Sequence, residues 1–370
     1  MKTFRYTIKG AIVSSVATAL IIGSSAVTAA GVLNVTNWAE YIAEDTISNF
    51  EKEFDVKVTY DVYDSSEAIE AKLLAGSTGY DVVIHAAADV GRLIPAGIFL
   101  ELDKSKIPNL KHMSPEVMDK LNNWDPGNNY MVPFMWGTHG VTYNAALVKE
   151  TYPNAPIGSM DMIFLPEHME KLAKCGVSFL DSPGDVIPMA LAYLGLDPSS
   201  TKKTDYKEVE VLLAKIRPYI KTFDNYAYQR MPTREFCVSV TWGPDGLLAM
   251  SGAEEANTGV VLDFFLPPGP GAARLWVDSW AIPADAKNIE NAYLFLDYVS
   301  RPEVGAADSD YTWYATANKD AIDLIDPAVT SSPAAFPPPD QVALMYTAVP
   351  LPPKIERIST RTWTNFKSGN

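Results

Sequence analysis

Strand and helix patterns alternate most clearly in residues 32–84, VLNVTNWAEYIAEDTISNFEKEFDVKVTYDVYDSSEAIEAKLLAGSTGYDVVI. Apolar residues at alternate positions or in short runs predict strands over 32–37, 56–63 and 81–84. Helical spacing of apolar residues predicts two intervening helices, with Asp45 and Ser66 as N-caps and Gly76 as a stop signal. This order indicates a mostly parallel sheet with helices on both faces.

Aromatic and acidic residues follow the first of these strands. Trp38, Glu40 and Tyr41 stand where that strand ends, and His85 follows the third strand. Ligands of open αβ sheets bind beyond the carboxyl ends of the strands. We therefore expect a ligand site at this edge.

A second αβ region follows residues 130–144, an extended stretch that we interpret as a first crossover between domains. The 340 residues after position 30 are enough for two domains. No internal repeat is visible. The expected elements are helices over 166–174, 206–220 and 288–299, strands over 238–241 and 276–282, a loop over 267–271, and a Pro-rich irregular segment over 331–353.

The first thirty residues have the pattern of a secretory signal peptide. A basic start precedes an apolar run over 11–22 and small residues at 27–30, and this run is too short to span a bilayer. A retained membrane anchor is the alternative.

Since three of the 30 basic residues lie in this leader and all 45 acidic residues lie beyond it, residues 31–370 carry a net charge of −18. Such a chain repels nucleic acid and attracts cations.

The two cysteines, Cys175 and Cys237, are interpreted as one disulfide, as is usual in an exported protein. In the chain-entropy view, closing so long a loop stabilises the fold by roughly 4 kcal/mol. Two thiols cannot complete a zinc site alone, and the four histidines show no metal spacing. We therefore expect no metal and no cofactor.

Three segments at predicted strand ends combine aromatic residues with an acid: Trp38, Glu40 and Tyr41, then Trp242 and Asp245, then Trp276 and Asp278. A linear polyamine needs a carboxylate for each buried ammonium, flat apolar walls for its methylenes, and ring faces for its charges. Such pairs also arise where core aromatics border solvated loops. The candidate ligand-binding residues are Trp38, Glu40, Tyr41, Asp185, Trp242, Asp245, Trp276, Asp278 and Tyr314.

At these residues the sequence resembles the bacterial periplasmic polyamine-binding proteins of ABC importers, closest to the putrescine/spermidine group. The likeness extends over essentially all of 31–370. It is carried by residues 37–42, 75–81, 175–181, 278–288, 315–319 and 361–364.

The resemblance implies a type II periplasmic-binding-protein fold, with two αβ lobes, a hinge and an interlobe ligand cleft. Lobe 1 would comprise 31–135 and 251–305, and lobe 2 would comprise 136–250 and 306–370. The implied protein is a periplasmic monomer that passes putrescine, spermidine or both to the permease subunits.

The resemblance also implies roles for single residues. Asp245 and Asp278 would hold the ammonium groups, and Trp38 and Trp242 would sandwich the methylenes. Trp276 stands where putrescine-preferring relatives have Phe, which slightly favours spermidine. Further departures from the family pattern, which put affinity for the smallest diamine in doubt, are Ala39, Glu40, His85 and Ala86.

Three other functions fit parts of the pattern. The chain could bind another small cationic solute, or it could be a sensory polyamine receptor. A secreted glycosidase also pairs carboxylates beside aromatic residues. No organised catalytic motif supports this enzyme. An amino-acid receptor would need an arginine for the substrate carboxylate, and the nearest one is Arg274.

Overall fold

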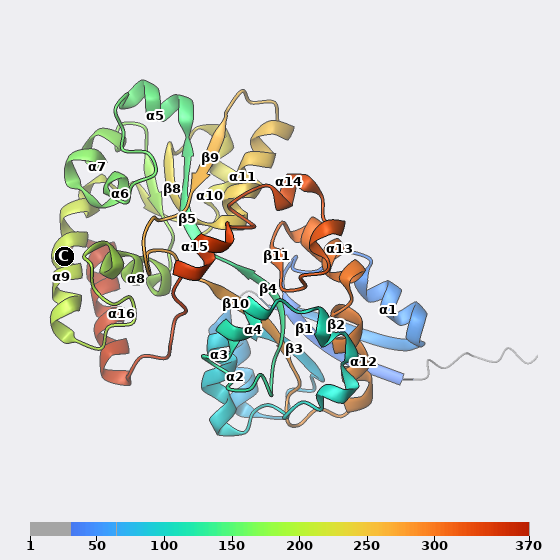
Figure 1. Cartoon of the computed structure of the whole chain (residues 1–370). Coiled ribbons are helices and arrows are strands. Elements are labelled where there is room, and N and C mark those ends of the chain that lie inside the picture. Colours follow the sequence, from blue (N-terminus) through green and yellow to red (C-terminus); the bar gives the residue numbers. More distant parts are fainter. Residues whose placement is uncertain (1–30, 64, 370) are drawn as a thin grey trace, which may run out of the picture.

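The computed structural model describes residues 31–63 and 65–369, so the predicted signal peptide over 1–30 lies outside the described residues. Two β-sheets, each covered by helices, form two lobes that lie side by side (Figure 1). The expected two-lobed αβ architecture is confirmed.

The first sheet has six strands in the order β11-β4-β10-β3-β1-β2. β1 is parallel to β2 and β3, as the sequence predicted, whereas β10 is antiparallel to β3 and β4, and β11 to β4. The sheet is therefore mixed rather than mostly parallel, because β10 returns from the other lobe and enters from the opposite end. The strands are β1 Gly31–Trp38, β2 Val56–Tyr63, β3 Val82–Ala86, β4 Val132–Gly137, β10 Trp276–Ala281 and β11 Ala315–Thr316.

Helices cover both faces of this sheet. Phe50 of α1 and Phe295 of α12 pack on one face, and Leu73 of α2 packs with α3 and α4 on the other. The helices of this lobe are α1 Thr46–Phe54, α2 Ser66–Ala75, α3 Ala87–Leu93, α4 Pro115–Leu121, α12 Ile289–Val299 and α13 Pro302–Thr312.

The two predicted helix N-caps, Asp45 and Ser66, differ from those in the structure. Ser65, rather than Ser66, caps α2 by accepting the Ala68 N–H. The Asp45 side chain accepts from the Asn49 side-chain amide instead of the α1 backbone.

The second sheet has five strands in the order β7-β6-β8-β5-β9. The C-terminal helix α16 packs Trp363 and Phe366 into the core of this lobe. The strands are β5 His139–Asn144, β6 Val177–Phe179, β7 Thr222–Phe223, β8 Val238–Trp242 and β9 Leu262–Phe265. The helices are α5 Ala145–Thr151, α6 Asp161–Phe164, α7 Pro166–Leu172, α8 Pro183–Tyr193, α9 Lys203–Ile216, α10 Ala227–Arg230, α11 Gly243–Glu255 and α16 Pro353–Ser368.

The chain passes between the sheets three times. Thr138 alone separates β4 from β5, so the first crossover lies within the expected stretch. The second occupies residues 266–275, between β9 and β10. The third follows β11 and leads to α16, and it contains α14 Pro327–Thr330 and α15 Pro339–Leu344. The segment expected to be irregular over 331–353 therefore includes a short helix.

The expected lobe boundaries differ from the strand membership. Residues 262–265 were assigned to lobe 1, yet β9 pairs with β5 in the second sheet. Residues 315–316 were assigned to lobe 2, yet β11 pairs with β4 in the first sheet. The chain crosses to the first sheet within the Pro- and Gly-rich segment after β9, so residues 262–265 still belong to the second sheet. β11 has only two residues, which is too short to give a periodic signal.

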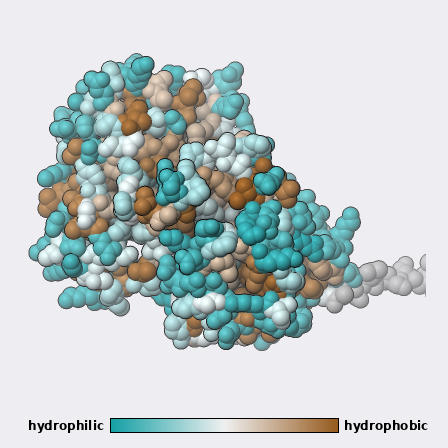
Figure 2. Space-filling model, in the orientation of Figure 1, coloured by the Kyte–Doolittle hydropathy of each residue, from teal (hydrophilic) through white to brown (hydrophobic). Residues whose placement is uncertain are grey.

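The surface mixes polar and apolar side chains. Hydrophilic residues dominate the lobe that holds the first sheet on the face seen in Figure 2. Within residues 31–63 and 65–369, no helix combines the length and apolar character needed to cross a membrane.

Cys175 and Cys237 form the predicted disulfide, with a Cα–Cα distance of 5.5 Å and a sequence separation of 62 residues. It ties the turn after α7 to the start of β8, whereas the candidate ligand-binding residues Trp242 and Asp245 follow the end of β8.

Replacing both cysteines with serine should lower the free energy of unfolding by roughly 4 kcal/mol, because the unfolded chain regains loop freedom. Thermal and denaturant unfolding measure this loss. A reducing agent should destabilise the native protein similarly and leave the cysteine-free variant unchanged. Equal stability of both proteins without reductant would contradict the prediction.

Candidate ligand-binding site

The candidate residues of the first lobe meet at one sheet edge because of strand direction. β1 ends at Trp38 and β3 at Ala86. β10 runs antiparallel to β3, with Asp278 opposite Ala86. The beginning of β10, which carries Trp276 and Asp278, therefore lies at the same edge as the ends of β1 and β3.

Tyr314 connects residues of both lobes. Its ring centroid lies 5.1 Å from that of Tyr41 in an edge-to-face arrangement and 5.6 Å from that of Trp276. Its hydroxyl donates to Oδ1 of Asp245, on the first turn of α11, at 3.4 Å. Tyr314 therefore places aromatic walls of the first lobe directly beside an acid of the second.

Asp245 and Asp278 are acids in an apolar environment. Burial raises the pKa of Asp245 to about 7, and the hydrogen bond from Tyr314 offsets part of this rise. Burial likewise raises the pKa of Asp278 to about 7, and the charge of Asp89 raises it further, although the hydrogen bond from Tyr41 and the charge of Arg274 lower it. Among the described residues, neither carboxyl group is within ion-pair distance of a cationic side chain. Both are placed to accept a cation.

Tyr41 and Trp38 form the remaining wall at the end of β1. Burial raises the pKa of Tyr41 well above its usual value, and the neighbouring Asp278 raises it further. The Trp38 ring lies 4.3 Å from the ring of Tyr63 and 6.0 Å from that of His85, between centroids. Within the described chain, the Trp38 indole N–H makes no hydrogen bond, whereas the Tyr41 hydroxyl faces the Asp278 carboxyl group. The Trp38 indole N–H could therefore serve a ligand.

Asp185 already has several partners in the protein. Its carboxylate accepts from Ser182 Oγ at 2.6 Å, Arg274 Nη1 at 3.1 Å and Trp242 Nε1 at 3.2 Å, and it lies 3.3 Å from His139 Nδ1. Burial by itself would raise the pKa of Asp185, but Arg274 and His139 outweigh it and hold the pKa well below its usual value. Asp185 thus orients the indole of Trp242.

Glu40 directly precedes Tyr41 but makes no hydrogen bond or ion pair within the described residues. It is exposed and occupies the turn after β1 with a φ of 55°. Of the nine predicted residues, the structure brings Trp38, Tyr41, Asp245, Trp276, Asp278 and Tyr314 around the interlobe edge, and it links Trp242 to Asp185 beside them.

Three residues beside this cluster were not assigned to it from the sequence. Tyr63 ends β2 next to Trp38, a position that the alternating strand pattern could have revealed. His139 and Arg274 reach Asp185 only through tertiary contacts. No sequence spacing signals these two.

Gly137, the last residue of β4, makes room for Trp276. A Cβ atom at position 137 would lie 2.4 Å from Cζ2 of the Trp276 ring, which is far too close. The glycine therefore fixes how deeply this ring packs against the crossover between the lobes.

Gly137→Ala should displace the Trp276 ring and weaken ligand binding by about tenfold, with a lower melting temperature as well, since overpacking is destabilising. Calorimetric titration and thermal unfolding test this. The matched control is Gly252→Ala in α11, where the added Cβ would meet its nearest neighbour at 3.9 Å. Normal affinity in Gly137→Ala would show that the ring position does not matter.

The fold and the site together define a two-lobed solute-binding protein with an anionic, aromatic site between its lobes. Residues 45–338 match the family model described as bacterial extracellular solute-binding protein. The chain belongs to this family, whose members bind solutes. It is therefore a binding protein and not an enzyme such as the glycosidase considered above.

Several relatives are similar over nearly their whole length. The putrescine-binding periplasmic protein PotF of Escherichia coli strain K12 is 45% identical over 340 residues, covering 91% of both chains. The putrescine-binding periplasmic protein SpuD of Pseudomonas aeruginosa strain UCBPP-PA14 is 42% identical, covering 91% of this chain and 92% of SpuD.

A solved structure supports the fold. The spermidine/putrescine transporter substrate-binding protein PotD of Streptococcus pneumoniae superposes with a TM-score of 0.78 at 24% identity, covering 92% of this chain and 99% of PotD. The type II binding-protein fold expected from the sequence is thus confirmed.

Proposed function

We propose that the protein captures a polyamine, putrescine or spermidine, outside the cytoplasm and delivers it to the permease of an ABC importer. The observation that carries this proposal is the pair of buried acids, Asp245 and Asp278, both close to Tyr314. Similarity to PotF and SpuD, both putrescine-binding periplasmic proteins, supports the same ligand class.

The chemistry of the pair explains why a polyamine fits. An ionised carboxylate is costly to bury without a partner, and each end of a diamine supplies one ammonium. The rings of Tyr41, Trp276 and Tyr314 contact one another, with Tyr41 beside Asp278 and Tyr314 beside Asp245. In this proposal they offer faces to the methylenes and cations. A sugar would leave both carboxylates without a cation.

In this proposal the two lobes close on the ligand. Residues 31–137 and 276–316 form lobe 1, and residues 139–265 with α16 form lobe 2. Three crossovers act as the hinge. A ligand that contacts both lobes favours the closed arrangement through its differential affinity for it. The protein would work as a periplasmic monomer after removal of residues 1–30.

A ligand screen tests the proposal directly. Thermal shift of the purified protein is measured with putrescine, cadaverine, spermidine and spermine, and with amino acids and sugars as controls. A bound ligand raises the melting temperature with concentration, so at least one polyamine should do so while neutral sugars should not. A chain that responds to sugars or amino acids alone would disprove the proposed function.

A further inference from the structure

Arg274 supplies a cation from within the protein to one of the site's own acids. Its Nη1 donates to Oδ1 of Asp185 at 3.1 Å, while Oδ2 of the same carboxylate accepts from the indole of Trp242. Asp185 is 3% exposed and Arg274 is 17% exposed as side chains. The guanidinium therefore occupies the position that an ammonium of a ligand would need in order to reach Asp185.

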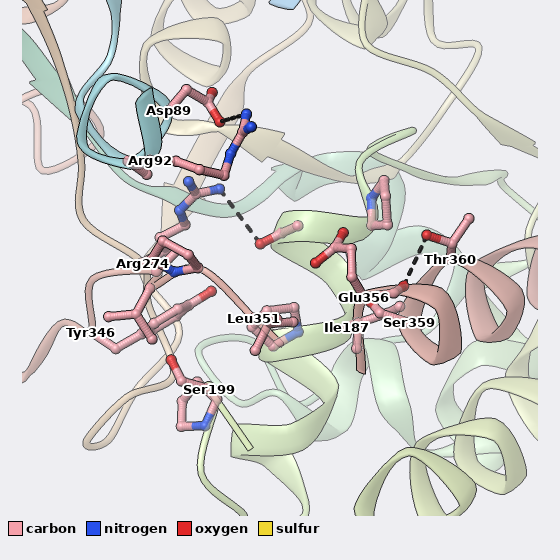
Figure 3. Close-up of a pocket in the computed structure, with 18 of the residues that line it drawn as sticks. Asp89, Arg92, Ile187, Ser199, Arg274, Tyr346, Leu351, Glu356, Ser359 and Thr360 are labelled. Carbon is pink, nitrogen blue, oxygen red and sulfur yellow. Dashed lines mark hydrogen bonds and ion pairs between the residues drawn. The ribbon is translucent and has the colours of Figure 1, made fainter. Parts of the chain in front are cut away.

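A cavity of about 540 Å³ lies on the other side of this ion pair. It is bordered by Asp89 and Arg92 of α3, Gly184 of α8, Arg274, Tyr346 and Glu356 of α16. Figure 3 shows Arg274 reaching into it between Arg92 and Tyr346, with Glu356 across the cavity. The Tyr346 hydroxyl makes no hydrogen bond within the described residues.

Arg274 thus belongs both to this cavity and to the ligand site. It contacts Asp185, which holds Trp242, and it stands two residues before Trp276. Its guanidinium also lies close enough to Asp278 to act on that carboxyl group electrostatically.

We propose that Arg274 is a specificity-determining residue that stands in for the third cation of a triamine, so that the site prefers a diamine. This inference rests on the proposed function. A diamine brings two charges, which Asp245 and Asp278 match. The third charge of spermidine would meet the guanidinium instead of a free carboxylate, and such a repulsive element is a common source of specificity. This repulsion outweighs the slight preference for spermidine suggested by Trp276.

Removing the guanidinium should open the site toward the cavity. In Arg274→Ala, Asp185 becomes available to a third ammonium, and Asp89, Glu356 and the Tyr346 hydroxyl border the space beyond it. The ratio of spermidine affinity to putrescine affinity should rise by about tenfold. Arg274→Gln, which keeps a donor for Asp185 and so protects the fold, should raise the ratio in the same direction.

Calorimetric titration of the full-length purified protein and its variants with both amines tests this inference. The matched control is Arg274→Lys, which keeps the positive charge and should keep the native ratio. The double variant Arg274→Ala with Asp185→Asn removes the third acid and should lose the gain. Thermal unfolding of each variant confirms that it is folded.

Two outcomes would overturn the inference about Arg274 and would leave the proposed polyamine-binding function unaffected. One is a native protein that already binds spermidine more tightly than putrescine. The other is a ratio unchanged within twofold in folded Arg274→Gln. A native protein that binds neither amine would instead overturn the proposed function.

Discussion

Replacing Asp278 with asparagine is expected to weaken putrescine binding by about 100-fold or more. Truncating one partner of a desolvated charge pair costs about 2–5 kcal/mol, and about 1.4 kcal/mol corresponds to tenfold in affinity. Asparagine has nearly the same shape, so it removes the charge while it preserves the contact with Tyr41.

The same substitution should stabilise the ligand-free protein at pH 8. Burial raises the pKa of Asp278 to about 7, which means that its ionised form destabilises the fold. A variant that melts higher yet binds weakly would separate a lost ligand contact from general damage. Titration calorimetry and thermal unfolding give the two readouts.

Glu40→Gln is the matched control for Asp278→Asn. Glu40 is an exposed acid in the turn after β1, and exposed charges contribute little to a fixed contact. The putrescine affinity of Glu40→Gln should stay within about twofold of the native value. If Asp278→Asn binds putrescine within threefold of the native protein, Asp278 is not an ammonium partner.

Putrescine binding should be strongly dependent on pH around neutrality. Asp245 and Asp278 have pKa values of about 7 in the ligand-free protein, so each is about half protonated at pH 7. A dication binds their ionised forms and should release about one proton in total at this pH. Affinity should fall by about tenfold or more between pH 8 and pH 6.

Calorimetry in two buffers of different ionisation enthalpy counts these protons. The observed heat should differ between the buffers at pH 7 and converge above pH 8.5, where both carboxyl groups are already ionised. Asp245→Asn should release about half as many protons at pH 7. Proton release that stays at zero from pH 6 to pH 8 would contradict the assignment of both acids.

The stability of the ligand-free protein should change in the opposite direction. Between pH 4 and pH 7 the folded state binds protons on these carboxyl groups that the unfolded state has already lost. The free energy of unfolding therefore gains a contribution as the pH falls through 7, and this contribution is complete below about pH 4. Asp308, which accepts from the Ala43 N–H and the Thr46 hydroxyl and whose pKa burial also raises to about 7, adds to this trend.

Local sequence patterns were sufficient to predict many elements of the fold. The strand over residues 56–63 and the stop of α2 at Gly76 lie where periodicity and helix-stop signals placed them. The disulfide was also predicted, because two cysteines in a chain expected to be exported leave a single pairing. These features depend on short-range geometry and composition, which a linear pattern records.

Contacts between residues distant in the chain determined the lobe boundaries and decided which buried acids are paired with a cation. β9 and β11 joined the sheets opposite to those expected, because a partner strand distant in the chain determines membership. Asp185, Asp245 and Asp278 look alike in the sequence, yet only Asp185 meets a guanidinium. Whether an acid is neutralised or left for a ligand depends on which cation the fold brings within a few ångströms, and periodicity carries no signal of that distance.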